Sequence, residues 1–145
     1  MGLLCIALGV TLRSWSAGVL HKTWELTTTG PYALIRNPLY VGSFLIMSGY
    51  ATLIDDVENI FVILGPLAFL YYLQVLHEER TLFNKYGMRW QEYASHVSRF
   101  FPWRLPQPGT LFGTWSVRDW LGSREYRAMI ATLAGIAALD LWRRW

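Results

Sequence analysis

The chain has 145 residues, which is enough for one domain of usual size and too few for two. Hydrophobic residues make up 53% and charged residues only 16%, against about 25% in a typical soluble protein. Because aromatic residues reach 16%, the composition excludes a disordered chain and argues against an ordinary soluble domain. The net charge of +3 is too small and too scattered to favour nucleic acid as a partner. Eight Trp and eight Tyr beside long apolar runs instead favour a membrane protein with aromatic side chains at its interfaces.

The first apolar segment, Met1 to Leu20, is predicted to be a membrane helix. A signal peptide would carry its positive charge before the apolar run, whereas Arg13 follows it and no cleavage signal is evident. The lone cysteine, Cys5, lies in this segment and excludes a disulfide within the sequence. The three histidines share no ligand spacing, so we predict no metal site.

A helical hairpin is predicted in the middle of the chain. A Gly-Pro pair at 30–31 indicates a turn, and two uncharged apolar stretches follow, Pro38–Ile54 and Ile60–Leu76. With about 17 residues each, they would be about 25 Å long, at the short end of the spanning range. The acidic connector at 55–59 is short, so the two helices should be antiparallel.

This hairpin brings the charges that flank it to one face of the membrane. Arg36 precedes the first stretch and Glu78-Glu79 follow the second, and charges at such depth tend to pair and to mark function. The guanidinium of an arginine suits a carboxylate, and a glutamate can hold an ammonium group. Arg36 with Glu78-Glu79 would therefore suit a zwitterionic cofactor that carries an amino-acid moiety. The alternative is that these charges only anchor the topology. Residues 77–145 carry ten Lys and Arg, which places this face in the cytoplasm.

The C-terminal part is predicted to be helical with interruptions. An amphipathic helix covers Glu78–Tyr93 and is broken at Gly87, and a Pro-rich loop follows. The mixed segment Leu111–Arg127 is predicted to be an interfacial helix or loop. The apolar segment Ala128–Trp142 has about 15 residues, which is short for a span, so a tilted membrane helix and a docked amphipathic helix are both open.

Two blocks of motif residues lie on either side of the hairpin. The first is Gly30-Pro31-Tyr32 with Arg36-Asn37-Pro38-Leu39-Tyr40-Val41-Gly42, and the second is Glu78-Glu79, Leu82, Tyr86-Gly87, Tyr93, Val97, Arg99 and Pro102. Together they resemble the integral-membrane methyltransferases related to isoprenylcysteine carboxyl methyltransferase and to phospholipid methyltransferases. The resemblance covers residues 9–103 and leaves 104–145 as an extension of the same single domain, 1–145. It implies an all-α, polytopic membrane helix bundle that binds S-adenosylmethionine at its cytoplasmic face.

The resemblance also implies a set of site residues. The cofactor-binding residues would be Tyr32, Arg36, Asn37, Pro38, Tyr40, Gly42, Glu78 and Glu79, and the catalytic ones Arg36, Glu78 and Arg99. The family usually has His at the position of Asn37, which can form hydrogen bonds but cannot titrate near neutral pH.

The expected methyl acceptor is lipophilic and enters from the lipid bilayer. It would be an isoprenylcysteine-type carboxylate, which needs no base, or a lipid-like amine or thiol, which Glu78 or Glu79 would deprotonate. Family members often have further helices upstream, so a lipid-facing wall would be either missing here or supplied by a second copy of the chain in a homodimer.

Two other readings stay open. A membrane sterol or enone reductase that uses NADPH has a similar closing region, which Lys85-Tyr86-Gly87, Trp90 and Tyr93 also fit. The adjacent Glu78-Glu79, and Arg99 before Pro102, favour the methyltransferase. A non-catalytic membrane scaffold would explain Asn37 as the decay of an enzyme site.

Overall fold

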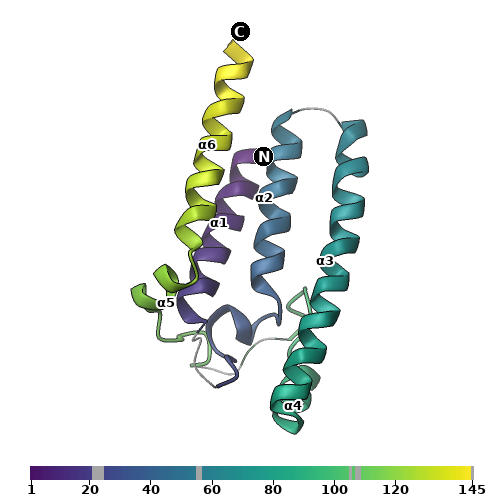
Figure 1. Cartoon of the computed structure of the whole chain (residues 1–145), viewed down its shortest axis with the longest axis vertical. Coiled ribbons are helices and arrows are strands. Elements are labelled where there is room, and N and C mark those ends of the chain that lie inside the picture. The colour runs from purple at the N-terminus through teal and green to yellow at the C-terminus, as the bar shows by residue number, and fades with distance from the viewer. Residues whose placement is uncertain (21–24, 55–56, 105, 107–108, 145) are drawn as a thin grey trace.

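The computed structural model describes residues 1–20, 25–54, 57–104, 106 and 109–144. All regular elements in these ranges are helical, which confirms the predicted all-α class. They are α1 (Gly2–Val19), the 3-10 turn η1 (Gly30–Ala33), α2 (Pro38–Ile54), α3 (Val57–Tyr86), α4 (Met88–His96), α5 (Val117–Gly122) and α6 (Glu125–Arg144). The four long helices stand roughly side by side, and η1, α4 and α5 gather at one end of the bundle (Figure 1). We call this the η1 end.

Glycines bring α1 and α2 into backbone contact. A Cβ atom added at Gly9 would lie 2.6 Å from the carbonyl oxygen of Gly42, and one at Gly42 would lie 2.8 Å from that of Gly9. Gly2 and Gly49 form a second reciprocal pair one heptad away. Small residues allow this close approach between helices in membranes. Of the described helices, α1 is long and apolar enough to cross a membrane, and α2 is an apolar helix of 17 residues.

The hairpin is present as predicted, but its second arm is longer. Helix α3 runs for 30 residues, so the predicted stretch Ile60–Leu76 continues through Glu78 and Glu79 without a break. It ends before Gly87, whose φ of +55° is a left-handed conformation that favours glycine. The predicted helical segment Glu78–Tyr93 and its break at Gly87 are confirmed, and its first part continues α3. Residues 55–56 of the predicted connector lie outside the described residues.

The C-terminal extension packs onto α1 and α2. The backbone N–H of Gly30 donates to the carbonyl of Thr110 at 2.8 Å, and that of Ser116 donates to Gly18 at 2.8 Å. Helix α6 lies beside α1 in Figure 1, and the Tyr50 hydroxyl of α2 donates to the Thr132 carbonyl of α6. With 20 residues, α6 is longer than the 15 predicted from its apolar run, because its charged ends are also helical.

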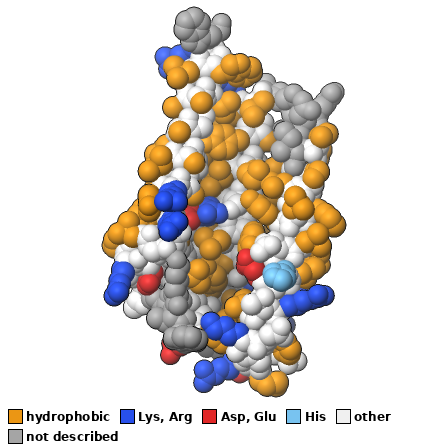
Figure 2. Space-filling model, viewed as in Figure 1, with side chains coloured by type: hydrophobic (Ala, Val, Ile, Leu, Met, Phe, Trp, Pro, Cys, Tyr) orange, Lys and Arg blue, Asp and Glu red, His pale blue; other side chains and the backbone are white. Residues whose placement is uncertain are grey.

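This arrangement corrects one argument about orientation. Helix α6 starts at the η1 end and returns to the opposite end, where the chain terminates (Figure 1). Arg143 there donates to the carbonyl of Leu53, near the end of α2. Arg143 and Arg144 therefore lie at the end opposite Arg36 and Glu79, although they belong to the ten Lys and Arg of residues 77–145 that were assigned to the cytoplasmic face. Figure 2 shows most of the visible Lys and Arg side chains toward the η1 end and apolar side chains along the helices above it.

We expect Gly9→Ala to destabilise the bundle, because its methyl group would force the backbones of α1 and α2 apart. Overpacking of this kind typically costs about 1–3 kcal/mol. The matched control is Gly122→Ala in α5, where an added Cβ meets no atom within 4 Å. Because alanine favours helix more than glycine does, the control should be neutral or stabilising. Thermal unfolding in detergent would measure both, and equal effects would contradict the close α1–α2 contact.

Candidate active site

The segment between η1 and α2 is held against the loop that follows α4. Ile35 and Ser98 form an isolated parallel bridge, and the backbone N–H of Arg36 donates to the Ser98 carbonyl at 2.8 Å. The helix α2 then begins at Pro38, which suits a first helical turn because proline lacks an N–H. These contacts bring Arg36 and Asn37 next to Arg99.

Glu79 is the centre of the polar cluster at this end. Its side chain is buried, with 8% of the residue exposed, and it receives hydrogen bonds from Arg99 Nη2 (2.8 Å to Oε2) and Nε (3.1 Å to Oε1). Asn37 Nδ2 donates to Oε1 at 3.3 Å, and Arg36 Nε lies 3.6 Å from the same oxygen. The predicted meeting of Arg36 with the Glu78-Glu79 pair is thus confirmed. We call Arg36, Asn37, Glu79 and Arg99 the Glu79 cluster.

The two arginines of the cluster differ in how well they are satisfied. The hydrogen bond to Glu79 raises the pKa of Arg99. Burial lowers the pKa of Arg36, although Glu79 opposes this shift. The buried Nε of Arg36 has no hydrogen-bond partner among the described residues, and the guanidinium lies 5.7 Å from the centre of the Trp90 ring. Arg36 therefore keeps bonding capacity for a ligand.

Glu78 has different surroundings from Glu79. The Tyr40 hydroxyl donates to its Oε1 at 2.6 Å, and Gln74 Nε2 donates to the same oxygen at 3.3 Å. No lysine or arginine among the described residues forms an ion pair with it. The two adjacent carboxylates thus differ in their partners. Arginines neutralise the charge of Glu79, whereas only neutral groups among the described residues donate hydrogen bonds to Glu78.

Two tyrosines support the loop beside the cluster. The Tyr93 hydroxyl donates to the Tyr32 carbonyl at 2.7 Å. Burial is the main cause that raises the pKa of both phenols, so they are neutral at physiological pH. The buried hydroxyl of Tyr32 has no hydrogen-bond partner among the residues that the structure describes.

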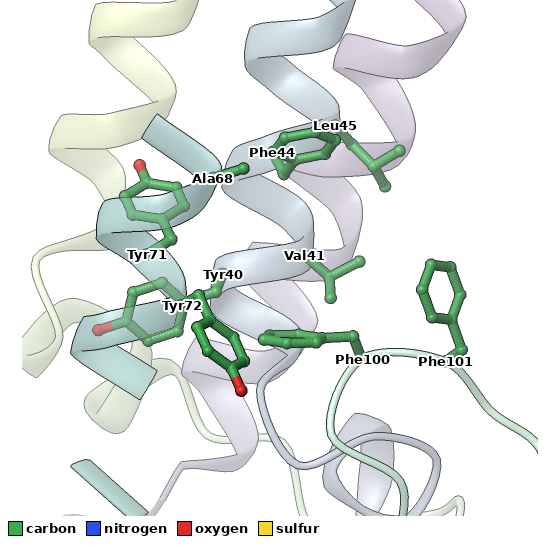
Figure 3. A pocket seen from close by; sticks show the side chains of 9 residues that line it. All are labelled: Tyr40, Val41, Phe44, Leu45, Ala68, Tyr71, Tyr72, Phe100 and Phe101. Atoms are coloured by element: carbon green, nitrogen blue, oxygen red, sulfur yellow. The ribbon is translucent and has the colours of Figure 1, made fainter. Parts of the chain in front are cut away.

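An apolar groove of about 490 Å³ lies between α2 and α3 (Figure 3). Its lining residues are Tyr40, Val41, Phe44, Leu45, Ala68, Tyr71, Tyr72, Phe100 and Phe101. We call it the aromatic groove. Phe44, Tyr72 and Phe101 are exposed, so the groove is open to its surroundings. Two of its lining tyrosines also contact charged residues. The Tyr40 hydroxyl donates to Glu78, and the ring centre of Tyr72 is 5.8 Å from the Arg99 guanidinium.

A second cavity, of about 290 Å³, lies beside Arg36 and has mixed character. Its lining includes Glu25, Tyr32, Arg36, Lys85, Tyr86, Trp90 and Tyr93. We call it the Arg36 cavity. The Glu79 cluster links the two spaces, because Arg36 lines this cavity and Arg99 contacts Tyr72 of the aromatic groove.

The predicted site residues thus fall into three groups. The Glu79 cluster holds Arg36, Asn37, Glu79 and Arg99, with Tyr32 beside it, and Tyr40 and Glu78 meet at the groove. Pro38 is fully buried at the start of α2. Gly42 packs against Gly9 and Arg13 of α1, and its expected contact with the cofactor stays a prediction.

Trp90 and Gln74 were not among the predicted site residues. Trp90 is 6% exposed and lies against Arg36, a pairing that needs the loop geometry to be seen. The spacing of Gln74 four residues before Glu78 on one helix was a usable signal for their contact.

Comparisons with known proteins bear on the family of this chain. Residues 1–89 match the family described as phospholipid methyltransferase, a range that includes α1, the hairpin and Glu78-Glu79. Over 104 residues, or 70% of this chain, it is 31% identical to the nickel-cobalt-cadmium resistance protein NccN of Alcaligenes xylosoxydans and to the cobalt-zinc-cadmium resistance protein CzcN of Cupriavidus metallidurans. The match covers 48% of each relative, so the chain spans about half the length of these curated relatives. No solved structure matches the chain. The chain belongs to the phospholipid methyltransferase family.

Proposed function

We propose that this chain is a membrane methyltransferase that uses S-adenosylmethionine to methylate a lipophilic acceptor, with an amine acceptor preferred over a carboxylate. The observation that carries the proposal is the pair of unlike cavities joined by the Glu79 cluster. The mixed Arg36 cavity suits the cofactor and the aromatic groove suits the acceptor. The proposal rests on this site and not on the names of the two relatives, which concern metal resistance.

The residues of the Arg36 cavity fit S-adenosylmethionine. Arg36 Nε, which is buried and makes no hydrogen bond among the described residues, can bind the carboxylate of its amino-acid moiety, and Glu25 offers the opposite charge for the ammonium group. Trp90 and Tyr93 offer ring faces, which attract cations such as a sulfonium. The volume of about 290 Å³ is near the lower limit of roughly 300–1,000 Å³ for small-ligand sites.

When bound, S-adenosylmethionine supplies a methyl group on a positively charged sulfur, so the protein mainly positions its substrates and excludes water. In this account, Arg36 orients the cofactor and Glu79 holds Arg36. The ion pair of Arg99 with Glu79 holds the loop after α4 against α3 and thereby supports the wall between the two cavities. Asn37 supplies a hydrogen bond to Glu79 and no base.

The acceptor class follows from Glu78. Tyr40 lines the aromatic groove and donates to this carboxylate, so an apolar chain in the groove would place its head group near Glu78. An ammonium head would be attracted and could give its proton to Glu78. A carboxylate head would meet a like charge that no cation among the described residues neutralises.

We place the η1 end in the cytoplasm. Arg36, Arg80, Lys85, Arg89 and Arg104 belong to segments at this end, whereas Arg143 and Arg144 end α6 at the other. An excess of Lys and Arg marks the cytoplasmic side of a membrane protein. The described basic residues of the η1 end outnumber the two terminal arginines of α6.

We expect Arg36→Ala to raise the Kd for S-adenosylmethionine by on the order of ten- to a hundredfold, the usual value of a hydrogen bond to a charged group. The matched control is Arg118→Ala in the short helix α5, where the arginine is exposed and the change should not matter. Calorimetric titration in detergent measures both constants. Unchanged affinity in Arg36→Ala would remove the cofactor from this cavity. Stabilisation of the parent by NADPH but not by S-adenosylmethionine would favour the reductase alternative.

The substitution Ala68→Trp should fill the aromatic groove and raise the KM for a lipophilic acceptor while leaving the Kd for S-adenosylmethionine as in the parent. Ala68 lines the groove, so a large ring there competes directly with an acyl or prenyl chain. Ala134→Trp, on the exposed face of α6, introduces the same ring away from the groove and serves as control. Methyl transfer from labelled S-adenosylmethionine to lipid extract gives the readout. Equal KM values for the two variants would exclude the groove as the acceptor site.

Glu78→Gln should slow methylation of an amine acceptor by on the order of 10²–10⁴-fold, the usual contribution of a general base. The same change should reduce the discrimination against a carboxylate acceptor of equal chain length, because the like charge is gone. Rates with a long-chain amine and a long-chain carboxylate, compared in parent and variant, test both statements. A parent that methylates the carboxylate faster than the amine would overturn the proposed acceptor class.

A further inference from the structure

A buried ion pair joins α6 to α1. Arg13 of α1 contacts Glu125, the first residue of α6, through Nε to Oε1 at 2.7 Å and through Nη2 to Oε2 at 2.9 Å. Glu125 is only 6% exposed. Two parallel hydrogen bonds from a guanidinium to a carboxylate fix the direction as well as the distance of the contact. The pair therefore sets where the start of α6 lies relative to α1.

The same guanidinium also reaches the first turns of α2. Arg13 Nη1 donates to the hydroxyl of Ser43 and lies 3.4 Å from the carbonyl oxygen of Leu39. The Ser43 hydroxyl in turn donates to the Leu39 carbonyl at 3.0 Å. Leu39 lies directly before Tyr40 and two residues after Asn37. Tyr40 donates a hydrogen bond to Glu78, and Asn37 donates one to Glu79. Arg13 thus contacts the backbone that carries two residues of the candidate active site.

The packing around Arg13 leaves little room for another arrangement. A Cβ atom on Gly42 would lie 2.6 Å from Arg13 Cγ, so glycine is needed where the arginine side chain crosses α2. Arg13 and Glu125 also affect the pKa of the Tyr32 hydroxyl. Its pKa is raised mainly by burial and further by Glu78 and Glu125, whereas Arg13 lowers it.

We infer that Arg13 and Glu125 are positioning residues for the active site, with α6 supplying the counter-charge that keeps Arg13 against the first turns of α2. The inference rests on the proposed function and deepens it. It gives the C-terminal helix, which lies beyond the residues matched by the family, a part in the reaction. Two apolar residues could attach α6 to α1 equally well, since buried ion pairs are often no more stable than apolar replacements. Apolar residues could not hold the Leu39 carbonyl and the Ser43 hydroxyl.

This difference separates a positioning role from a merely structural one. Glu125→Gln leaves the half-buried Arg13 without its counter-charge, so both Tm and kcat/KM should fall, the latter by on the order of ten- to a hundredfold. In the double variant Arg13→Leu with Glu125→Leu, Tm should return close to that of the parent while kcat/KM stays low. If kcat/KM recovers together with Tm, the pair is only structural and the inference is overturned.

Two further variants keep the test decisive. Tyr50→Phe removes another α6 contact, the bond to the Thr132 carbonyl, and should lower Tm slightly with kcat/KM unchanged. A loss of kcat/KM equal to that of Glu125→Gln would contradict the inference. If the double leucine variant does not fold, Arg13→Lys replaces it, because lysine can pair with Glu125 but cannot hold all three partners. Parent-like kcat/KM in Arg13→Lys would also overturn it.

A readout without turnover separates this inference from the proposed function. With 3-fluorotyrosine incorporated, the ¹⁹F signal of Tyr40 is assigned through Tyr40→Phe and reports on its contact with Glu78. Glu125→Gln should move this signal, whereas Tyr50→Phe should leave it in place. If the parent transfers no methyl group, the proposed function fails, and a shifted Tyr40 signal would still support the positioning role. An unmoved Tyr40 signal in Glu125→Gln would overturn the positioning role whatever the activity.

Discussion

The arrangement of the η1 end depends on the buried carboxylate of Glu79. A buried charge is tolerated only when it is paired, and Glu79 draws its partners from two other segments: Arg36 and Asn37 before α2, and Arg99 in the loop after α4. Removing one partner of such a group typically costs about 3–5 kcal/mol, because the remaining charges stay buried. One carboxylate on α3 thus fixes both loops that border the cavities.

The neighbouring carboxylate shows how position along one helix separates two tasks. Glu78 and Glu79 are adjacent in sequence, so their side chains leave α3 in directions about 100° apart. One meets two arginines, and the other meets Tyr40 and Gln74. The structural carboxylate is neutralised, whereas the one beside the aromatic groove keeps its charge available for an acceptor. A single Glu-Glu pair can therefore serve the framework and the chemistry together.

Much of this could be read from the sequence. The uncharged runs and the short connector gave the hairpin and hence the meeting of Arg36 with Glu79, because an antiparallel pair must return to its starting face. The contacts that were not anticipated join residues far apart in the chain. Arg99 was predicted to be catalytic, but its ion pair with Glu79 was not anticipated. The pairing of Arg13 with Glu125 spans 112 residues and leaves no local periodic signal in the sequence. The predicted length of α6 was too short because the prediction counted only its apolar residues.

The central claim is that the cofactor and the acceptor occupy different cavities on either side of the Glu79 cluster. Photo-crosslinking with an azido derivative of S-adenosylmethionine, followed by mass spectrometry of the labelled peptides, tests it most directly. We expect labels on the residues within 25–36 and 82–93 that line the Arg36 cavity, and protection of these labels by the unmodified cofactor. A photoreactive long-chain amine should instead label residues 40–45 and 68–72. Cofactor labels in the aromatic groove, or identical patterns for both probes, would contradict the account.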